Sequence, residues 1–304
     1  MNPFLAKLFF DETDFGEADR VLITHADDFG FCHAANAATA ECLASGASSC
    51  ASVLVNAPWF PEAARLCREN PRFDVGVHLT LTSEYDGLRW SAVSTRDATA
   101  GLHDEEGYLW RTVVDALTHV PPEVARAEMR AQLEIALEAG IDVTHIDTHM
   151  GTVVHPRYLL DYLDLAREFE VPAFLPRPDL ERLEALPQSR SFAAEYVAAL
   201  EGVSDADVPM LDSIVIDTLL PLDQCGGNKR DFFETAIRGI EPGLTHLLFH
   251  PAEASAELEA ATGTWETRNA DFEVFSDPAM RAFIEGEGIH LIGYRELRDA
   301  LRSV

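Results

Sequence analysis

The sequence VLITHADDFG, from Val21 to Gly30, runs from a short apolar segment directly into two adjacent aspartates. Residues 21–26 are typical of a buried strand, because the run is apolar, short and rich in β-branched side chains. The alanine-rich residues 34–45, followed by Gly46, predict a helix that ends at a glycine. A strand followed by a helix is therefore the unit with which the sequence begins.

The same unit recurs along most of the chain. Apolar runs predict strands at residues 50–55, 75–79, 143–147, 173–175, 211–216, 244–249 and 289–292. Helical patterns lie at residues 61–69, 122–139, 155–169, 192–200, 231–238 and 279–285, and a last helix begins near residue 295. Apolar strands that alternate with helices favour a parallel sheet covered on both faces. We predict an α/β fold, an irregular TIM-like (β/α) barrel, with an open doubly wound sheet as the alternative.

One segment breaks this pattern. Residues 83–120 lack periodicity and contain Trp90, Tyr108 and Trp110, so we expect a long loop excursion over one end of the fold. These aromatic side chains either offer stacking faces to a sugar or pack the loop. No linker or repeat divides the rest, so we expect a single barrel domain at residues 20–304 after an N-terminal extension at residues 1–19.

The composition narrows the classes of partner. The 52 acidic and 23 basic residues give a net charge of −29, which disfavours nucleic acids and anionic membranes as partners. The five cysteines include no C-x-x-C pair, so we expect free thiols in a reducing cytosol. The apolar residues 4–10 are too few for a secretory signal, and no run is long enough to span a membrane. The chain is expected to be cytoplasmic, with its oligomeric state open and a homodimer included among the options.

Polar residues with metal-binding side chains lie at or just beyond the carboxyl ends of four of the predicted strands. They are Asp27 and Asp28, His78, the series His145, Asp147 and His149, and His250. All stand at carboxyl ends of parallel strands, where β/α folds place their chemistry. Residues two apart in a strand share a face, so the series after residue 143 points one way, and we expect it to point inward.

A carboxylate with two imidazoles is a recurrent ligand set for a catalytic divalent metal. Asp28, His78 and His149 are the candidate ligands. Zn²⁺, Mn²⁺, Co²⁺ and Fe²⁺ suit the imidazoles, and Mg²⁺ is less typical of two nitrogen ligands. Taken singly, each histidine could be a structural residue, and the aspartate pair could cap a helix. The remaining histidines, His25 and His246 among them, are interpreted as structural or surface residues.

The blocks Ala26-Asp27-Asp28-Phe29-Gly30, Gly76-Val77-His78-Leu79-Thr80-Leu81-Thr82, Thr144-His145-Ile146-Asp147-Thr148-His149 and His250-Pro251-Ala252-Glu253 resemble the signature blocks of the YdjC/ChbG carbohydrate deacetylases, in the same order. The resemblance runs from about residue 20 to residue 301. It implies a distorted (β/α) barrel that removes N-acetyl groups from sugars such as chitooligosaccharides with one divalent metal, often assigned in that family as Mg²⁺. The family's metal ligands match Asp28, His78 and His149, and its base matches Asp27. Met150 and Gly151 stand where better-characterised members carry histidines.

These residues form a coherent hydrolytic site. A metal-bound water would lose its proton to Asp27, and His250 would protonate the leaving amine. Asp147 would orient an imidazole ligand. We therefore predict a metal-dependent carbohydrate deacetylase that uses one divalent ion, Mg²⁺ or Zn²⁺, and acts on a small carbohydrate. The alternatives are another barrel metal hydrolase, a sugar isomerase, or a sugar- or metal-binding protein with a vestigial site.

Overall fold

The computed structural model describes residues 18–185, 189–204, 208–216, 219 and 221–303. Residues 1–17 of the predicted N-terminal extension lie outside these described residues. Within the described ranges, no helix is both long enough and apolar enough to cross a membrane.

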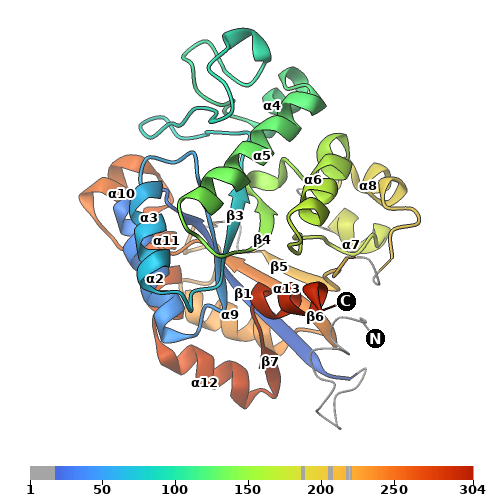
Figure 1. The fold of residues 1–304 in the computed structure, drawn as a ribbon. Helices are drawn as coiled ribbons and strands as arrows, with labels where there is room; N and C mark the ends of the chain where they lie inside the picture. The colour runs from blue at the N-terminus through green and yellow to red at the C-terminus, as the bar shows by residue number, and fades with distance from the viewer. Residues whose placement is uncertain (1–17, 186–188, 205–207, 217–218, 220, 304) are drawn as a thin grey trace.

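In the described part of the chain, seven parallel strands form the centre of the molecule, with the helices around them (Figure 1). The strands are β1 (Arg20–Phe29), β2 (Cys50–Val53), β3 (Val75–Leu79), β4 (Val143–Thr148), β5 (Ser213–Ile216), β6 (Gly243–Phe249) and β7 (Ile289–Leu291). Their order is β4-β3-β2-β1-β6-β5, and β7 pairs with β1. The start of β1 pairs with β7 and its end with β2, while β6 pairs with β1 along residues 20–26. This division of β1 makes the sheet irregular.

A short segment between β4 and β5 closes the sheet into a ring. Ala173 bridges Ile146 in β4, and Pro176 bridges Leu211 just before β5. The predicted strand at residues 173–175 is thus present only as isolated bridges. Together with the continuous ladder from β5 through β6, β1, β2 and β3 to β4, these bridges complete an irregular (β/α) barrel. The predicted fold class is confirmed.

The helices follow the strands much as the sequence predicts. They are α2 (His33–Ser45), α3 (Phe60–Glu69), α4 (Val113–His119), α5 (Pro122–Glu138), α6 (Pro156–Glu168), α7 (Leu180–Ala185), α8 (Ala193–Ala199), α9 (Lys229–Arg238), α10 (Ala256–Ala261), α11 (Trp265–Phe275), α12 (Pro278–Gly286) and α13 (Tyr294–Arg302). Prolines at the first turns of α3, α5, α6 and α12 suit positions where a missing N–H costs nothing. Gly46 ends α2 with φ 75°, which glycine adopts without a steric penalty. The sequence did not predict α4, α7, α10 or α11.

The excursion at residues 83–119 is packed rather than open, and it rises above β3 in Figure 1. It contains the short 3-10 helix η1 (Ala98–Ala100) as well as α4. Trp90 is buried and its indole N–H donates to the carbonyl of Thr82. Trp110 stacks on the ring of His119 at 4.1 Å. Of the three aromatic residues, Tyr108 alone is exposed, and the guanidinium of Arg89 lies 4.9 Å from its ring centre. These aromatic side chains pack the loop.

Candidate metal centre and active site

The polar residues picked out at the strand ends meet at one end of the barrel. Asp27 and Asp28 lie in the last residues of β1, and His78 lies next to the end of β3. His149 begins the 3-10 helix η2 (His149–Gly151) directly after β4, and His250 follows β6. The side chains of Asp28, His78 and His149 form one buried group. The structure therefore brings together all three residues that the sequence proposes as metal ligands.

Three atoms of this group face one another. Nε2 of His78 lies 3.2 Å from Nδ1 of His149, and Oδ1 of Asp28 lies 3.6 Å from the first nitrogen and 3.4 Å from the second. Ligands bound about 2.0–2.2 Å from one cation have similar separations from one another. The spacing of the three atoms thus fits a shared metal ion.

The other nitrogen of each imidazole is held by a carboxylate. Nδ1 of His78 lies 2.9 Å from Oδ1 of Asp147, and Nε2 of His149 lies 3.0 Å from Glu84. An ionised carboxylate only accepts hydrogen bonds, so each of these nitrogens carries a proton. In a metal-bound site the nitrogens that face Asp28 would then present lone pairs. This is the arrangement in which a carboxylate orients a histidine ligand toward a metal.

One of the three converging atoms receives no hydrogen bond from the described residues. Oδ1 of Asp28 is buried and accepts no hydrogen bond from the described residues. Two imidazole lone pairs and a carboxylate oxygen repel one another unless a proton or a cation lies between them. The donor set therefore fits one divalent cation.

Charged neighbours keep the ligand carboxylate ionised. Burial alone would raise the pKa of Asp28, but the guanidinium of Arg268 and the imidazole of His149 hold it well below its usual range. Burial likewise would lower the pKa of His149, whereas Glu84 and Asp28 raise it to about 10. Burial would raise the pKa of Asp147, but His78 and His25 lower it. The carboxylates of Asp28 and Asp147 are thus anionic at neutral pH, which favours cation binding.

Asp27 lies beside this group with its two oxygens in different surroundings. Oδ1 lies 2.6 Å from Nδ1 of His25. Oδ2 lies 3.7 Å from Nε2 of His250 and 3.9 Å from Nε2 of His78. His25 therefore fixes the orientation of the carboxylate and leaves Oδ2 directed toward His250 and His78.

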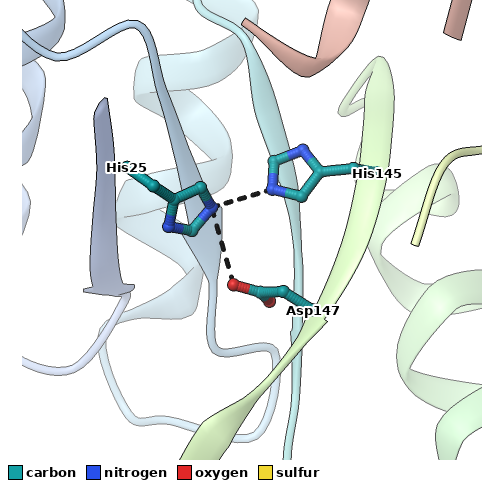
Figure 2. A group of neighbouring side chains, drawn as sticks. All are labelled: His25, His145 and Asp147. Carbon is teal, nitrogen blue, oxygen red and sulfur yellow. Dashed lines mark hydrogen bonds and ion pairs between the residues drawn. The ribbon is translucent and has the colours of Figure 1, made fainter. Parts of the chain in front are cut away.

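His25 begins a buried chain of polar groups inside the barrel. Figure 2 shows the side chains of His25, His145 and Asp147 pointing toward one another from β1 and β4. Nε2 of His25 lies 2.8 Å from Nε2 of His145 and 3.5 Å from Oδ2 of Asp147. The N–N separation is that of a hydrogen bond with a shared proton, and it is short for two ligands of one metal ion.

This buried series of polar groups continues to the far end of the barrel. Nδ1 of His145 lies 2.9 Å from the hydroxyl of Thr144, which donates to Asp74. Asp74 precedes β3, so this series of polar groups spans the barrel from its carboxyl end to its amino end. Burial raises the pKa of Asp74 to about 6 against the hydrogen bond of Thr144. The expectation that His145 and Asp147 share an inward face is confirmed.

A cavity of about 610 Å³ adjoins the site. Asp27, Asp147 and His250 lie in its wall. None of the aromatic residues predicted as stacking faces, Trp90, Tyr108 and Trp110, is among its lining residues, whereas Phe174, Phe192 and Tyr196 are.

Four contacts of the site were not predicted from the sequence. Glu84 lies in the aperiodic excursion, and Ser52, whose hydroxyl donates to Asp147 at 2.7 Å, lies within a buried strand. Arg268 lies on the unpredicted helix α11. His25 was interpreted as structural, although it stands two residues before Asp27 on the same face of β1. That spacing alone could have indicated their contact.

Known proteins of one family are similar to this chain along most of its length. The sequence profile of the YdjC-like protein family matches residues 21–286. A carbohydrate deacetylase from Thermus thermophilus is 32% identical over 291 residues, covering 93% of this chain and 95% of that protein. A carbohydrate deacetylase from Thermoanaerobacter pseudethanolicus is 23% identical over 279 residues, covering 92% of this chain and 100% of that protein.

A solved structure has the same fold. A crystal structure from Enterococcus faecalis, named for cellobiose-phosphate cleavage, superimposes with a TM-score of 0.72 at 25% identity. The match covers 92% of this chain and 99% of that one. The family profile spans most of the barrel, including Asp27, Asp28, His78, His149 and His250. The resemblance seen in the sequence is thereby confirmed, and the chain belongs to the family of YdjC-like proteins.

Proposed function

We propose that this enzyme hydrolyses the N-acetyl group of an acetylated amino sugar or oligosaccharide, and that the reaction depends on one divalent metal ion. The observation that carries the proposal is the convergence of Asp28, His78 and His149 on one point, with Asp27 and His250 beside them. Relatives that align over more than nine-tenths of the chain carry the name carbohydrate deacetylase. Together, the site and these relatives support an amide hydrolase that acts on sugars.

The three proposed ligands would hold the metal at the barrel mouth. A divalent cation bound there would polarise the acyl carbonyl and lower the pKa of a bound water toward neutrality. Two imidazoles and one carboxylate suit Zn²⁺, Mn²⁺, Co²⁺ or Fe²⁺ better than Mg²⁺. Asp147 and Glu84 would fix the imidazole rings through hydrogen bonds to their outer nitrogens.

Asp27 is proposed as the general base. Its Oδ2 faces the metal ligands, while Oδ1 is occupied by His25. As water adds to the acyl carbon, Oδ2 would accept the proton that the water loses. The hydrogen bond from His25 restricts rotation of the carboxylate, so the base is oriented before the substrate binds.

His250 is proposed as the general acid. Its Nε2 lies 3.7 Å from Oδ2 of Asp27, so both groups can reach one scissile amide. When the C–N bond breaks, Nε2 would give its proton to the nitrogen of the leaving amine. The products are a carboxylic acid and the free amino sugar, with the atoms of one water divided between them.

Metal-dependent acetate release tests the proposal directly. The protein would be stripped with a chelator, reloaded singly with Zn²⁺, Mn²⁺, Co²⁺ or Mg²⁺, and incubated with N-acetylglucosamine and its short oligomers. We expect acetate and free amine to be released in equal amounts, and only when a metal is present. Conversion of a substrate without acetate release would favour another hydrolase or an isomerase. Affinity for acetylated sugars without turnover under every metal would favour a vestigial binding site.

Cytoplasmic location stays a prediction made from the sequence, and the oligomeric state stays open, with a homodimer among the options. Size-exclusion chromatography with light scattering would test the second.

A further inference from the structure

The cavity beside Asp27 and His250 is large relative to an acetyl group. Its volume of about 610 Å³ lies within the roughly 300–1,000 Å³ found for sites that bind drug-sized molecules. Because both proposed catalytic residues lie in its wall, a substrate whose amide reaches them would place another part of itself in the cavity.

The rest of the wall is predominantly apolar. Strands, helices and the excursion all contribute aliphatic or aromatic side chains, among them Leu117, Val154, Phe174, Ile214 and Leu248. Two further residues of the wall, Val114 and Met150, are 71% and 47% exposed, so apolar surface continues outward from the cavity. Exposed apolar side chains that adjoin a cavity are typical of a binding surface.

Polar side chains are a minority in this wall: beside Asp27, Asp147 and His250 they are Thr148, His155, Ser189, Ser191, Tyr196 and His246. Two of them are already paired within the protein. The hydroxyl of Tyr196 donates to the carbonyl of Pro176, and Nδ1 of His246 is paired with the hydroxyl of Tyr294. Sugar hydroxyls buried against aliphatic side chains would lose hydrogen bonds to water without replacing them. An alkyl or aryl group would gain free energy from the same burial.

We propose that this cavity binds an apolar alkyl or aryl group of the substrate, so that the enzyme acts on amphiphilic acylated amino sugars. The inference rests on the proposed deacetylase function for the position of the amide. The apolar group has two sources, a longer N-acyl chain or an apolar aglycone on the sugar. The amino sugar itself lies outward from the apolar wall.

Two matched substrate series test the proposal and distinguish the sources. One series consists of methyl, butyl, hexyl and octyl β-glycosides of N-acetylglucosamine. The other keeps the methyl glycoside and lengthens the N-acyl group from acetyl to butanoyl, hexanoyl and octanoyl. In one series kcat/KM should rise by about fourfold per methylene until the cavity is filled, as expected for methylenes leaving water. A value of kcat/KM that does not change with length in either series, with methyl and oligosaccharide substrates turned over, overturns the inference.

A pair of variants ties the effect to the cavity. Val114→Asp places a charge on exposed α4 at the edge of the cavity and should lower the octyl-to-methyl ratio of kcat/KM at least tenfold. Leu160→Asp on α6 is the matched control, since Leu160 is also an exposed aliphatic residue (58%) and does not line the cavity. Equal ratios in the two variants and the wild type would contradict the assignment.

Binding of an unreactive probe separates this inference from the proposed function. Hexyl β-glucoside carries no amide, and its titration by calorimetry should show a negative heat-capacity change that methyl β-glucoside lacks. If no substrate is hydrolysed but the hexyl probe binds in this way, the proposed function fails and the apolar cavity stands. If hydrolysis occurs and the probe does not bind, the cavity assignment fails.

Discussion

A guanidinium nitrogen of Arg268 lies 2.8 Å from Oδ2 of Asp28, and both side chains are buried. The same guanidinium donates to the hydroxyl of Tyr85 at 2.8 Å and lies 5.3 Å from the ring centre of Phe31. One oxygen of Asp28 is therefore bound by a fixed cation while the other faces the two imidazoles. The carboxylate is held ionised and oriented before any metal arrives.

This ion pair predicts that replacing Arg268 destabilises the metal-free protein more than the metal-loaded protein. Arg268→Met should lower the free energy of unfolding of the metal-free protein by about 3–5 kcal/mol, because it leaves a buried carboxylate without its partner. A bound divalent cation supplies a second positive charge, so the loss should be smaller in the metal-loaded protein. Urea unfolding with chelator and with Mn²⁺ measures both values.

Arg65→Met is the control for that comparison. Arg65 is exposed and pairs with Glu69 one turn along α3, so its loss should cost less than about 1 kcal/mol with or without metal. An Arg268→Met loss that is the same in both conditions would show that the arginine acts on packing and not on the charge of Asp28.

The two imidazoles are expected to be indispensable for tight metal binding. His78→Ala and His149→Ala should each abolish it and leave the circular dichroism spectrum of the barrel in place, because each removes one of three ligands. Elemental analysis after dialysis gives the stoichiometry. His33→Ala removes an exposed histidine that pairs with Glu62 and should retain the metal. The ligand assignment is wrong if both site variants still bind one equivalent.

Replacing each of the two adjacent aspartates should have a different effect. Asp28→Asn should lose metal affinity, whereas Asp27→Asn should keep the metal and lose about 10²–10⁴ in kcat, since a base matters only for the chemical step. Metal titration and acetate release on the same preparations give both readouts. Equal metal loss in the two variants would mean that the pair binds jointly and that the base lies elsewhere.

His250→Ala should keep the metal and lower kcat far more than it raises KM, because protonation of the leaving amine is needed only in the transition state. The loss should shrink with an activated aryl ester, whose leaving group needs no proton. Loss of metal would instead identify His250 as a further ligand. Equal losses on amide and ester would exclude the acid role.

Protonation of Asp74 should make the free energy of unfolding depend on pH. Its pKa of about 6 in the folded protein exceeds the value of about 3.9 for an exposed aspartate, so the folded state retains a proton that the unfolded chain releases. Stability from this group is complete below about pH 4 and falls by about 3 kcal/mol as pH rises through 6. Asp74→Asn should remove this fall. Urea unfolding of the wild type and the variant, both with chelator, from pH 4 to 7.5 measures this fall. A difference between their free energies of unfolding that does not change with pH would contradict the prediction.

The strands and the proximity of the three proposed metal ligands could be predicted from the sequence because both depend on local pattern. Short apolar runs mark the strands, and polar residues directly after them must lie at one end of a parallel barrel. Asp28, His78 and His149 follow this rule, so their proximity could be inferred without knowing the barrel's exact closure.

The contacts that support these ligands could not be predicted in this way. The buried residues of α11 include Thr267, Arg268 and Asp271, so the helix lacks the apolar periodicity by which helices are recognised. Glu84 reaches His149 from a loop without periodicity, and its position depends on how the excursion packs. Such contacts depend on tertiary structure alone.

The backbone of Asp28 limits which residues can replace this proposed metal ligand. Asp28 has φ 65°, a left-handed conformation that aspartate, asparagine and glycine tolerate and that β-branched residues resist. Replacement by asparagine keeps the turn, the neighbouring aspartate and the entry into α2, and removes the ligand charge. Replacement by valine or isoleucine would strain the same turn. A single nucleotide change converts an aspartate codon into an asparagine codon, so among replacements of Asp28 this one removes the charge without straining the turn.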